Sequence, residues 1–242
     1  MTETEWLACT NPKPMLAYIR GKATERKLRL FDVACCRRIW HLIQDEDSRK
    51  AIDVFEKYAD GKADEVELDE ARENSYDAHG AAHRAATAAG WSASAWVTNA
   101  AANAASCVTF HSQDWLSDTS FFETAIWAAR ASAGPQVEGI WSDSAHPDRL
   151  AAEYQEQSGL LRHIFNSFHL LLIEPLWLSW NDATVVSIAH RIYDGRRFSD
   201  LPILGDALQD AGCDQADILN HCRQPGEHVR GCWLVDLLLD KS

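Results

Sequence analysis

The sequence predicts an all-α protein, an irregular multi-helix bundle with an alanine-rich central region. Three observations indicate this fold class. Apolar residues recur at steps of three and four positions along much of the chain, which places them on one face of a helix. Helix-capping patterns precede several of these segments. The 242 residues include only 12 Gly and 7 Pro, fewer turn residues than an all-β chain of this length needs.

The first helices are marked by their caps. Thr2 and Glu5 have the spacing of a capping box, and Asn11 before Pro12 gives a second N-cap followed by proline in the first turn. Thr24 is the expected N-cap of a longer helix. The apolar face of that helix comprises Leu28, Phe31, Cys35, Ile39 and Leu42. We therefore expect a buried helix that reaches Leu42.

An acidic segment follows. Between positions 45 and 77 the chain carries 13 Asp and Glu against 5 Lys and Arg. Asp47 is the expected N-cap of a helix that buries Ile52 and Phe55 and stops at Gly61. The helical pattern resumes over 67–87 and continues into the alanine-rich region.

The alanine-rich region has no charged side chain from Ala85 to Gln113. A spanning helix needs about 20 predominantly apolar residues, whereas this stretch is small and polar. It therefore predicts closely packed helices and no membrane span.

Proline and glycine divide the rest of the chain. Loops are expected around Gly134 and His146, and Pro147 is expected to open a helix through about Phe165. The apolar run 168–180 contains Pro175 and predicts a buried irregular connection. Later N-caps are expected at Asn181 or Asp182, at Ser199 or Asp200, and at Asp214, with a last helix over 229–240. We expect a single helical domain over 1–242, which can be divided into N-terminal and alanine-rich helices (1–134) and a C-terminal helical subdomain (147–242).

Charge and cysteine content indicate the compartment and the class of partner. A formal net charge of −13 repels phosphate backbones, so a nucleic-acid partner is not expected. The first residues lack the basic and apolar parts of a secretory signal. Seven Cys, an odd number that includes the adjacent Cys35 and Cys36, favour reduced thiols in the cytoplasm over a disulfide framework.

Both ends of the chain resemble a family of uncharacterised bacterial proteins. The N-terminal part of the resemblance lies in the segments RKLRLF (26–31) and ACCRRIW (34–40). The C-terminal part lies in DALQDAGC (206–213), HCR (221–223) and HVRGCW (228–233). The resemblance implies a helical fold with a variable centre. It implies no activity, cofactor or catalytic residue.

Side chains able to bind a metal are densest near the C-terminus. The candidate ligands are Cys213, His221, Cys222, His228 and Cys232. Thiolate and imidazole are the ligands that zinc prefers, and four of them form a closed tetrahedral site. His228 and Cys232 are four positions apart at the start of the expected last helix, so they would point the same way. The spacings match no standard zinc motif, however, and buried Cys packs as a small apolar residue, so packing is the favoured interpretation and zinc the alternative.

A basic stripe precedes the acidic segment. Arg26, Lys27, Arg37 and Arg38 share one side of the expected helix and could contact a partner. The favoured alternative is that they pair with this protein's own acidic segment, because the net negative charge opposes an anionic partner. Glu153 and Glu156 lie three positions apart without the histidines of a di-iron site and are expected on a solvated face.

No serine-nucleophile elbow, Walker-type loop or dinucleotide-binding fingerprint occurs in the chain. The sequence therefore favours a non-enzymatic helical module for protein interaction or regulation, with an unidentified protein as partner. The alternative is a metal-dependent (zinc) enzyme or a nucleic-acid-associated protein that uses the C-terminal Cys/His cluster. An active site assembled from distant residues would leave no local motif, so enzymatic activity stays open.

Overall fold

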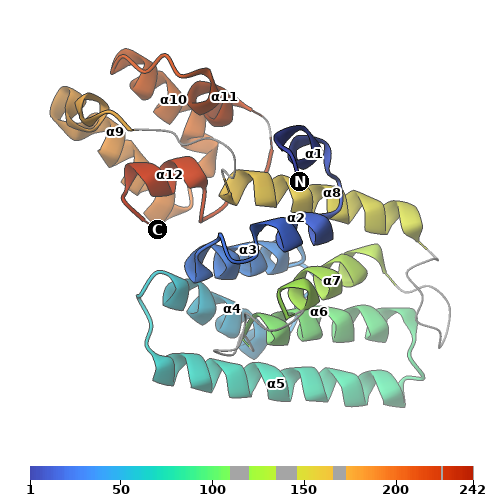
Figure 1. The fold of residues 1–242 in the computed structure, drawn as a ribbon. Helices are drawn as coiled ribbons and strands as arrows, with labels where there is room; N and C mark the ends of the chain where they lie inside the picture. Colours follow the sequence, from blue (N-terminus) through green and yellow to red (C-terminus); the bar gives the residue numbers. More distant parts are fainter. Residues whose placement is uncertain (110–119, 135–145, 166–172, 225, 242) are drawn as a thin grey trace. The chain divides into compact units, whose positions relative to one another are not determined.

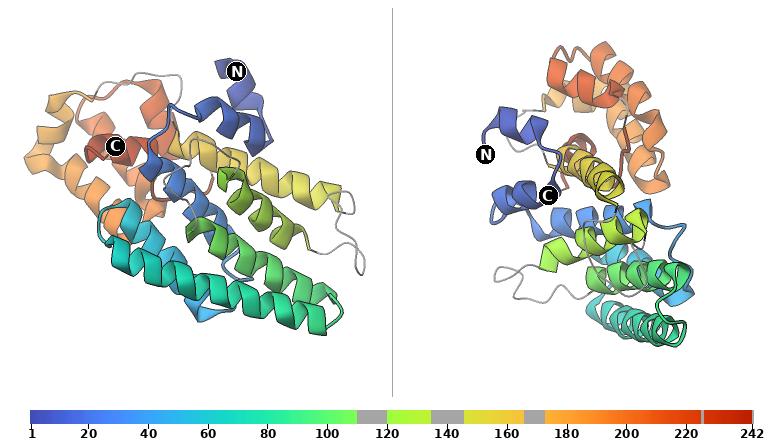
Figure 2. Two further views of the ribbon diagram at one scale, coloured as in Figure 1. Left: turned by 60° about the horizontal axis from the view of Figure 1, so that its bottom comes forward. Right: turned by 90° about the vertical axis from the view of Figure 1, so that its right-hand side faces the viewer.

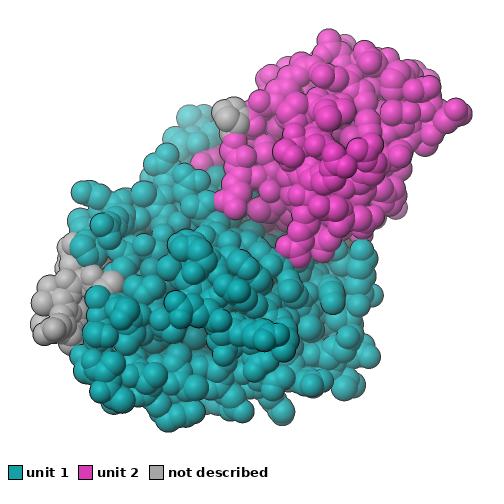
Figure 3. Space-filling model, turned by 180° about the vertical axis from the view of Figure 1, so that it is seen from behind, with its two compact units in different colours: residues 1–161 teal, residues 162–242 magenta. Residues whose placement is uncertain are grey.

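The fold is given by a computed structural model that describes residues 1–109, 120–134, 146–165, 173–224 and 226–241. Within these residues it contains twelve α-helices, one 3₁₀ helix and no strand, which confirms the predicted all-α class (Figure 1). None of the described helices combines the length and the apolar character needed to cross a membrane. The helices form two compact units, residues 1–161 and 162–242 (Figure 3).

Unit 1 contains the first eight helices, the last of which ends in unit 2. They are α1 (Glu3–Ala8), α2 (Pro12–Ile19), α3 (Glu25–Arg38), α4 (Glu46–Ala59), α5 (Glu65–Ala88), α6 (Ala93–Thr109), α7 (Ser120–Ala133) and α8 (Pro147–Ile164). The long helix α5 packs against α4 and α6, and α6 packs against α7 (Figure 2). Helix α3 contacts α4, α6 and α7, so it is the central helix of this unit.

The caps predicted at the N-terminus are present. Thr2 and Glu5 form both bonds of a capping box, and the Asn11 side chain accepts a hydrogen bond from the Lys13 backbone N–H at 3.0 Å. Thr24 likewise caps α3. These bonds satisfy backbone donors that the first turn of a helix leaves without an intrahelical partner.

Two boundaries in this region differ from the prediction. Helix α3 ends at Arg38, because the backbone at Ile39 leaves helical geometry, so Leu42 lies outside the helix. Ile39 is nevertheless buried. Helix α4 is capped by Asp45 and not by Asp47, since the Asp45 carboxylate accepts the Ser48 backbone N–H at 2.8 Å.

The alanine-rich region forms the contact between α6 and α7. Alanines on both helices are fully or almost fully buried, among them Ala100, Ala104, Ala105, Ala125, Ala128 and Ala129. Such small side chains let the two backbones approach closely, so these alanines pack inside unit 1. The chain turns between α5 and α6 at Gly90 and Trp91, which both have positive φ.

Unit 2 begins with the last residues of α8 and contains the C-terminal helices. They are α9 (Pro175–Gly195), the 3₁₀ helix η1 (Phe198–Asp200), α10 (Leu201–Asp210), α11 (Ala216–Arg223) and α12 (Trp233–Leu238). Their apolar faces enclose a core that includes Trp177, Tyr193, Leu204, Leu208 and Leu234.

The predicted boundaries of unit 2 are corrected at several points. Pro175 begins α9 instead of interrupting a connection, since proline is compatible with a first helical turn. The expected cap at Asn181 or Asp182 is a kink inside α9, where three residues through Ala183 have positive φ. Helix α12 begins at Trp233, so neither Val229 nor His228 is helical.

The N-cap of α11 is Gln215, not Asp214, whereas Asp200 precedes α10 as predicted. Residues 168–172 of the predicted connection, and most of the predicted loop between Gly134 and His146, lie outside the described residues.

The division between the units also differs from the predicted one. The sequence placed 147–242 together, whereas residues 147–161 of α8 belong to unit 1. Side chains of α8 explain this assignment: Gln157 donates to the backbone oxygen of Ala125 on α7 at 3.0 Å, and Glu153 binds Arg38 on α3.

A pair of glycines tests the packing between α10 and α11. A Cβ atom on Gly205 would lie 2.8 Å from the Cβ of Cys222, whereas a Cβ on Gly159 of α8 would meet nothing within 4 Å. We expect Gly205→Ala to lower the free energy of unfolding by about 1–3 kcal/mol through overpacking. Gly159→Ala should raise it by about 0.5–1 kcal/mol, because it removes backbone entropy from the unfolded chain. Urea unfolding followed by circular dichroism measures both; equal effects would contradict the close α10–α11 contact.

Candidate functional site

Three histidines and one cysteine meet in unit 2. His163 lies near the end of α8, His221 lies in α11, His228 lies in the connection after α11, and Cys232 is the N-cap of α12. The possible ligand atoms of His163, His221 and Cys232 lie within 4.8 Å of one another, and all three residues are buried. We call the four residues the imidazole–thiol cluster.

The hydrogen bonds of His163 place its proton. Its Nε2 accepts the backbone N–H of Val229 at 3.1 Å, so this nitrogen has no proton of its own. In the neutral ring the proton is then on Nδ1, which lies 2.9 Å from the Nδ1 of His228 and donates to it. His228 carries its own proton on Nε2, 3.3 Å from the backbone oxygen of Gln224.

The hydrogen bonds of His221 place its proton in the same way. The indole N–H of Trp233 can only donate, and its Nε1 lies 3.1 Å from Nδ1 of His221. The Nε2 of His221 therefore carries the proton and donates to the Cys232 sulfur at 3.2 Å. The Gln224 side-chain nitrogen lies 3.4 Å from the same Nδ1 and is a second donor to it.

Burial favours the neutral form of His221 and His228. The rings of His163 and His221 stack with centroids 5.0 Å apart, and His228 meets His163 edge to face at 4.4 Å. Burial, with a smaller effect of His228, lowers the pKa of His221 to about 3. Burial also lowers the pKa of His228, partly opposed by its hydrogen bond to the Gln224 backbone. Neutral imidazole is the form that binds metal ions.

The structure divides the predicted metal ligands. His221 and Cys232 converge, and His228 joins them through its hydrogen bond with His163 and its ring contact with His221. Cys213 and Cys222 lie in the apolar core of unit 2 and do not belong to the group of atoms that converge within 4.8 Å in the described residues. Burial, and then the nearby Cys232, raise the pKa of the Cys222 thiol to about 12, so it is an unreactive packed thiol.

His163 is the member of the cluster that the sequence did not reveal. It lies 58 positions before His221, and no local spacing connects the two. The available signal was weak: His163 is three positions after Leu160 and next to Ile164, both of which are buried. A histidine beside such residues is compatible with simple packing, so only the fold shows its neighbours.

The predicted basic stripe is engaged within unit 1. Arg26 binds Asp60 at 3.1 Å, and Arg37 forms ion pairs with Asp53 and Glu56. These carboxylates all lie in the acidic segment 45–77. Lys27 is half-buried on α3. Arg26 and Arg37 therefore pair with carboxylates of this protein's own acidic segment in the described structure.

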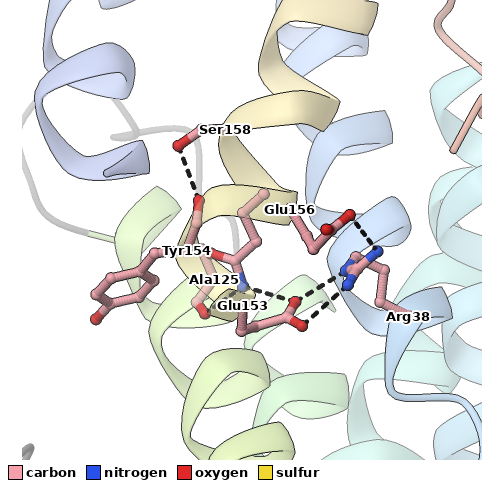
Figure 4. Close-up of polar contacts among 7 residues, drawn as sticks. Arg38, Ala125, Glu153, Tyr154, Glu156 and Ser158 are labelled. Carbon is pink, nitrogen blue, oxygen red and sulfur yellow. Dashed lines mark hydrogen bonds and ion pairs between the residues drawn. The ribbon is translucent and has the colours of Figure 1, made fainter. Parts of the chain in front are cut away.

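Arg38 binds outside that segment, at helix α8. Its Nε and Nη2 atoms donate to the two carboxylate oxygens of Glu153 at 2.9 and 3.1 Å, and its Nη1 lies 3.5 Å from Glu156 (Figure 4). Gln157 also donates to Glu153, at 3.4 Å. Glu153 is buried, so the predicted solvated face holds for Glu156 alone. The reason is that α8 packs Glu153 against α3.

The adjacent thiols on α3 are packed in the core. Burial, and then the nearby Asp32, raise the pKa of both Cys35 and Cys36 well above the ordinary value. The neighbouring arginines act in the opposite direction but are a smaller effect. Neither thiol is therefore an activated nucleophile.

Comparison with known proteins does not assign a family. No protein-family model matches the chain, and neither the search by sequence nor the search by solved structure gave a match.

The neutral state of His221 predicts acid sensitivity. The unfolded ring takes up a proton near its ordinary pKa of 6.5, whereas the folded ring does so only near 3. Below about pH 6.5 the unfolded state binds more protons, so the free energy of unfolding falls as the pH drops. We expect the metal-free protein to lose up to about 1.4 kcal/mol per pH unit from this one group. Urea titrations of wild type and His221→Gln between pH 7 and pH 4 measure it; the variant should lose less, and parallel curves would contradict the buried neutral ring.

The Arg38–Glu153 pair predicts non-additive mutations. Arg38→Leu should lower the free energy of unfolding by about 3–5 kcal/mol, because it leaves the Glu153 carboxylate buried without its main partner. Arg38→Leu combined with Glu153→Leu should lower it less than the sum of the two single changes. Chemical denaturation of the four proteins gives the coupling. Additive effects would show that the two side chains do not share one interaction.

Proposed function

We propose that this protein is a non-enzymatic helical interaction module that binds a basic partner protein through the exposed face of α5. This face, called the α5 outer face below, comprises Val66, Asp69, Glu70, Glu73, Tyr76 and Asp77, all of which are exposed. The observation that carries the proposal is the exposure of two large apolar side chains among these carboxylates: Val66 is 75% exposed and Tyr76 58%.

The geometry of α5 supports a separate outer face. Leu68, Ala71 and Ser75 are buried where α5 packs against its neighbours α4 and α6. At 100° per residue, Val66, Glu70 and Glu73 lie on the opposite side of the helix. The helix is fixed at its start by a capping box between Asp64 and Glu67, so the outer face is presented on a rigid element.

The charge distribution supports a basic partner. Arg26 and Arg37 of the central helix α3 are neutralised by Asp60, Asp53 and Glu56 inside unit 1. The carboxylates of the α5 outer face project into solvent, with Asp69 paired to Arg72. Opposite charge on a partner would accelerate association and fix its orientation, while Val66 and Tyr76 supply apolar contact area.

The alternative metal-dependent enzyme has less support. A catalytic zinc site keeps one coordination position open to substrate, whereas His163, His221 and Cys232 are buried. In unit 1 the adjacent thiols are packed, and their raised pKa makes them poor nucleophiles. An interaction module requires none of these groups to react.

Substitution of the apolar pair tests the proposal. The wild-type protein is first used to capture a partner from host-cell extract, and the partner is identified and purified. Calorimetry then measures its affinity for the wild type, for the double variant Val66→Ser/Tyr76→Ser and for the control Ile203→Ser. Ile203 is 56% exposed on α10 in unit 2, so it matches Tyr76 in exposure. We expect the double variant to lose about 1.4 kcal/mol or more, at least tenfold in affinity, and the control to bind as the wild type does.

The titration also separates a specific interface from nonspecific adhesion. Binding should weaken as salt is raised, because exposed charges are screened. A purified partner that binds the double variant as tightly as the wild type, or that is itself acidic, would contradict the proposal.

A further inference from the structure

We propose that the imidazole–thiol cluster is a reversible binding site for a divalent cation of the zinc class, with His163, His221 and Cys232 as ligands. The three residues come from three segments of unit 2, the end of α8, helix α11 and the start of α12. Zinc binds well to nitrogen and thiolate sulfur, whereas cations such as Mg²⁺ and Ca²⁺ prefer oxygen. This inference does not depend on the α5 outer face.

The distances suit such an ion. Zinc binds imidazole nitrogen at about 2.0–2.1 Å and thiolate at about 2.3 Å in a tetrahedral arrangement, which places neighbouring ligand atoms about 3.3–3.6 Å apart. The His221 Nε2 and Cys232 Sγ atoms are 3.2 Å apart, and the three ligand atoms lie within 4.8 Å of one another. Side-chain shifts of about an ångström would bring the three ligands to these separations, and a water molecule would take the fourth position.

The existing hydrogen bonds make the site reversible. A ligating imidazole binds the ion with one nitrogen and donates a proton from the other. His221 has the opposite arrangement, because Trp233 donates to its Nδ1. On binding, the proton of His221 must move from Nε2 to Nδ1, and the Trp233 bond must break. Gln224, 3.4 Å from that nitrogen, can rotate its amide and accept the new N–H through its oxygen.

The metal-free cluster is complete without an ion. Both nitrogens of His163, of His221 and of His228 have hydrogen-bond partners. Unit 2 therefore does not need metal to satisfy these buried groups, unlike a zinc finger that folds only with its ion. Metal and the internal hydrogen bonds compete for the same atoms.

The proton balance of binding follows from these positions. His163 and His221 are neutral before and after binding, so neither releases a proton to solvent. The Cys232 sulfur binds as thiolate, and its proton leaves to water. Uptake of one divalent ion should therefore release one proton.

Titration of tag-free protein with Co²⁺, followed by displacement with Zn²⁺, tests the site. We expect one equivalent of Co²⁺ to produce a thiolate-to-cobalt charge-transfer band and tetrahedral visible bands, and Zn²⁺ to abolish both. Cys232→Ser should lose the charge-transfer band. Cys222→Ser is the matched control, because its thiol lies in the same core outside the ligand group, and it should bind as the wild type does.

Trp233→Phe separates this site from adventitious binding. It removes the indole N–H that opposes ligation by His221, so the affinity for Co²⁺ should rise about tenfold, in the range of outer-shell effects. A nonspecific site elsewhere would not respond. Circular dichroism of each variant verifies that unit 2 is folded.

Three results would overturn the proposal. The first is wild-type protein that takes up no stoichiometric Co²⁺, which decides the question even if a variant fails to fold. The second is a charge-transfer band that persists in folded Cys232→Ser. The third is unfolding of the wild type when a chelator removes the ion, because a metal-free cluster with complete hydrogen bonding should keep its structure.

Discussion

Two donor-only groups determine the chemistry of unit 2. The indole N–H of Trp233 and the backbone N–H of Val229 each point at a ring nitrogen that must accept. Since a neutral imidazole has one donor and one acceptor, these two contacts set the protons of His221 and His163 and, through His163, that of His228. Within unit 2, the N-terminal part of α12 and the connection before it are thereby tied to His163 and to α11.

This constraint explains why the cluster has the residue types of a zinc site and is nevertheless hydrogen-bonded throughout without an ion. The same four side chains resemble a set of zinc ligands, yet each ring has its hydrogen bonds within the protein. Burial reinforces this state by lowering the pKa of His221 and His228, so that protonation does not disrupt the bonds near neutral pH. An ion could enter only by replacing these hydrogen bonds, and their loss would weaken its net binding relative to a structural zinc site.

Unit 1 is organised by a different electrostatic arrangement. On its central helix α3, Arg26 binds Asp60, the residue that follows α4. Arg37 binds carboxylates of α4, and Arg38 binds a carboxylate of α8. The basic groups are thus used inside the unit, while α5 exposes acidic residues around Val66 and Tyr76. The outer face of α5 thus displays part of the chain's strongly negative net charge at the surface.

Local sequence patterns predicted most helices well and their ends less well. Caps such as Thr2, Asn11 and Thr24 were identified because the capping residue and the backbone groups it satisfies are adjacent in the chain. Periodicity extended α3 to Leu42 although the helix ends at Arg38, since apolar spacing continues when a turn keeps Ile39 buried. Pro175 predicts a break but begins α9, because proline both interrupts helix interiors and opens helices, and the sequence alone does not distinguish the two cases.

The sequence by itself determined the helical class, the order of most helices and the residue types of the candidate site. It also places His221, His228 and Cys232 within a dozen positions, and this spacing alone predicts that they could be metal ligands. Only the tertiary structure brought His163 to them, removed Cys213 and Cys222 from the ligand group, and paired Arg38 with Glu153 across 115 positions. The physical reason is that hydrogen bonds and metal ligation act over a few ångströms in space, and the sequence specifies spacing only within one turn or one helix.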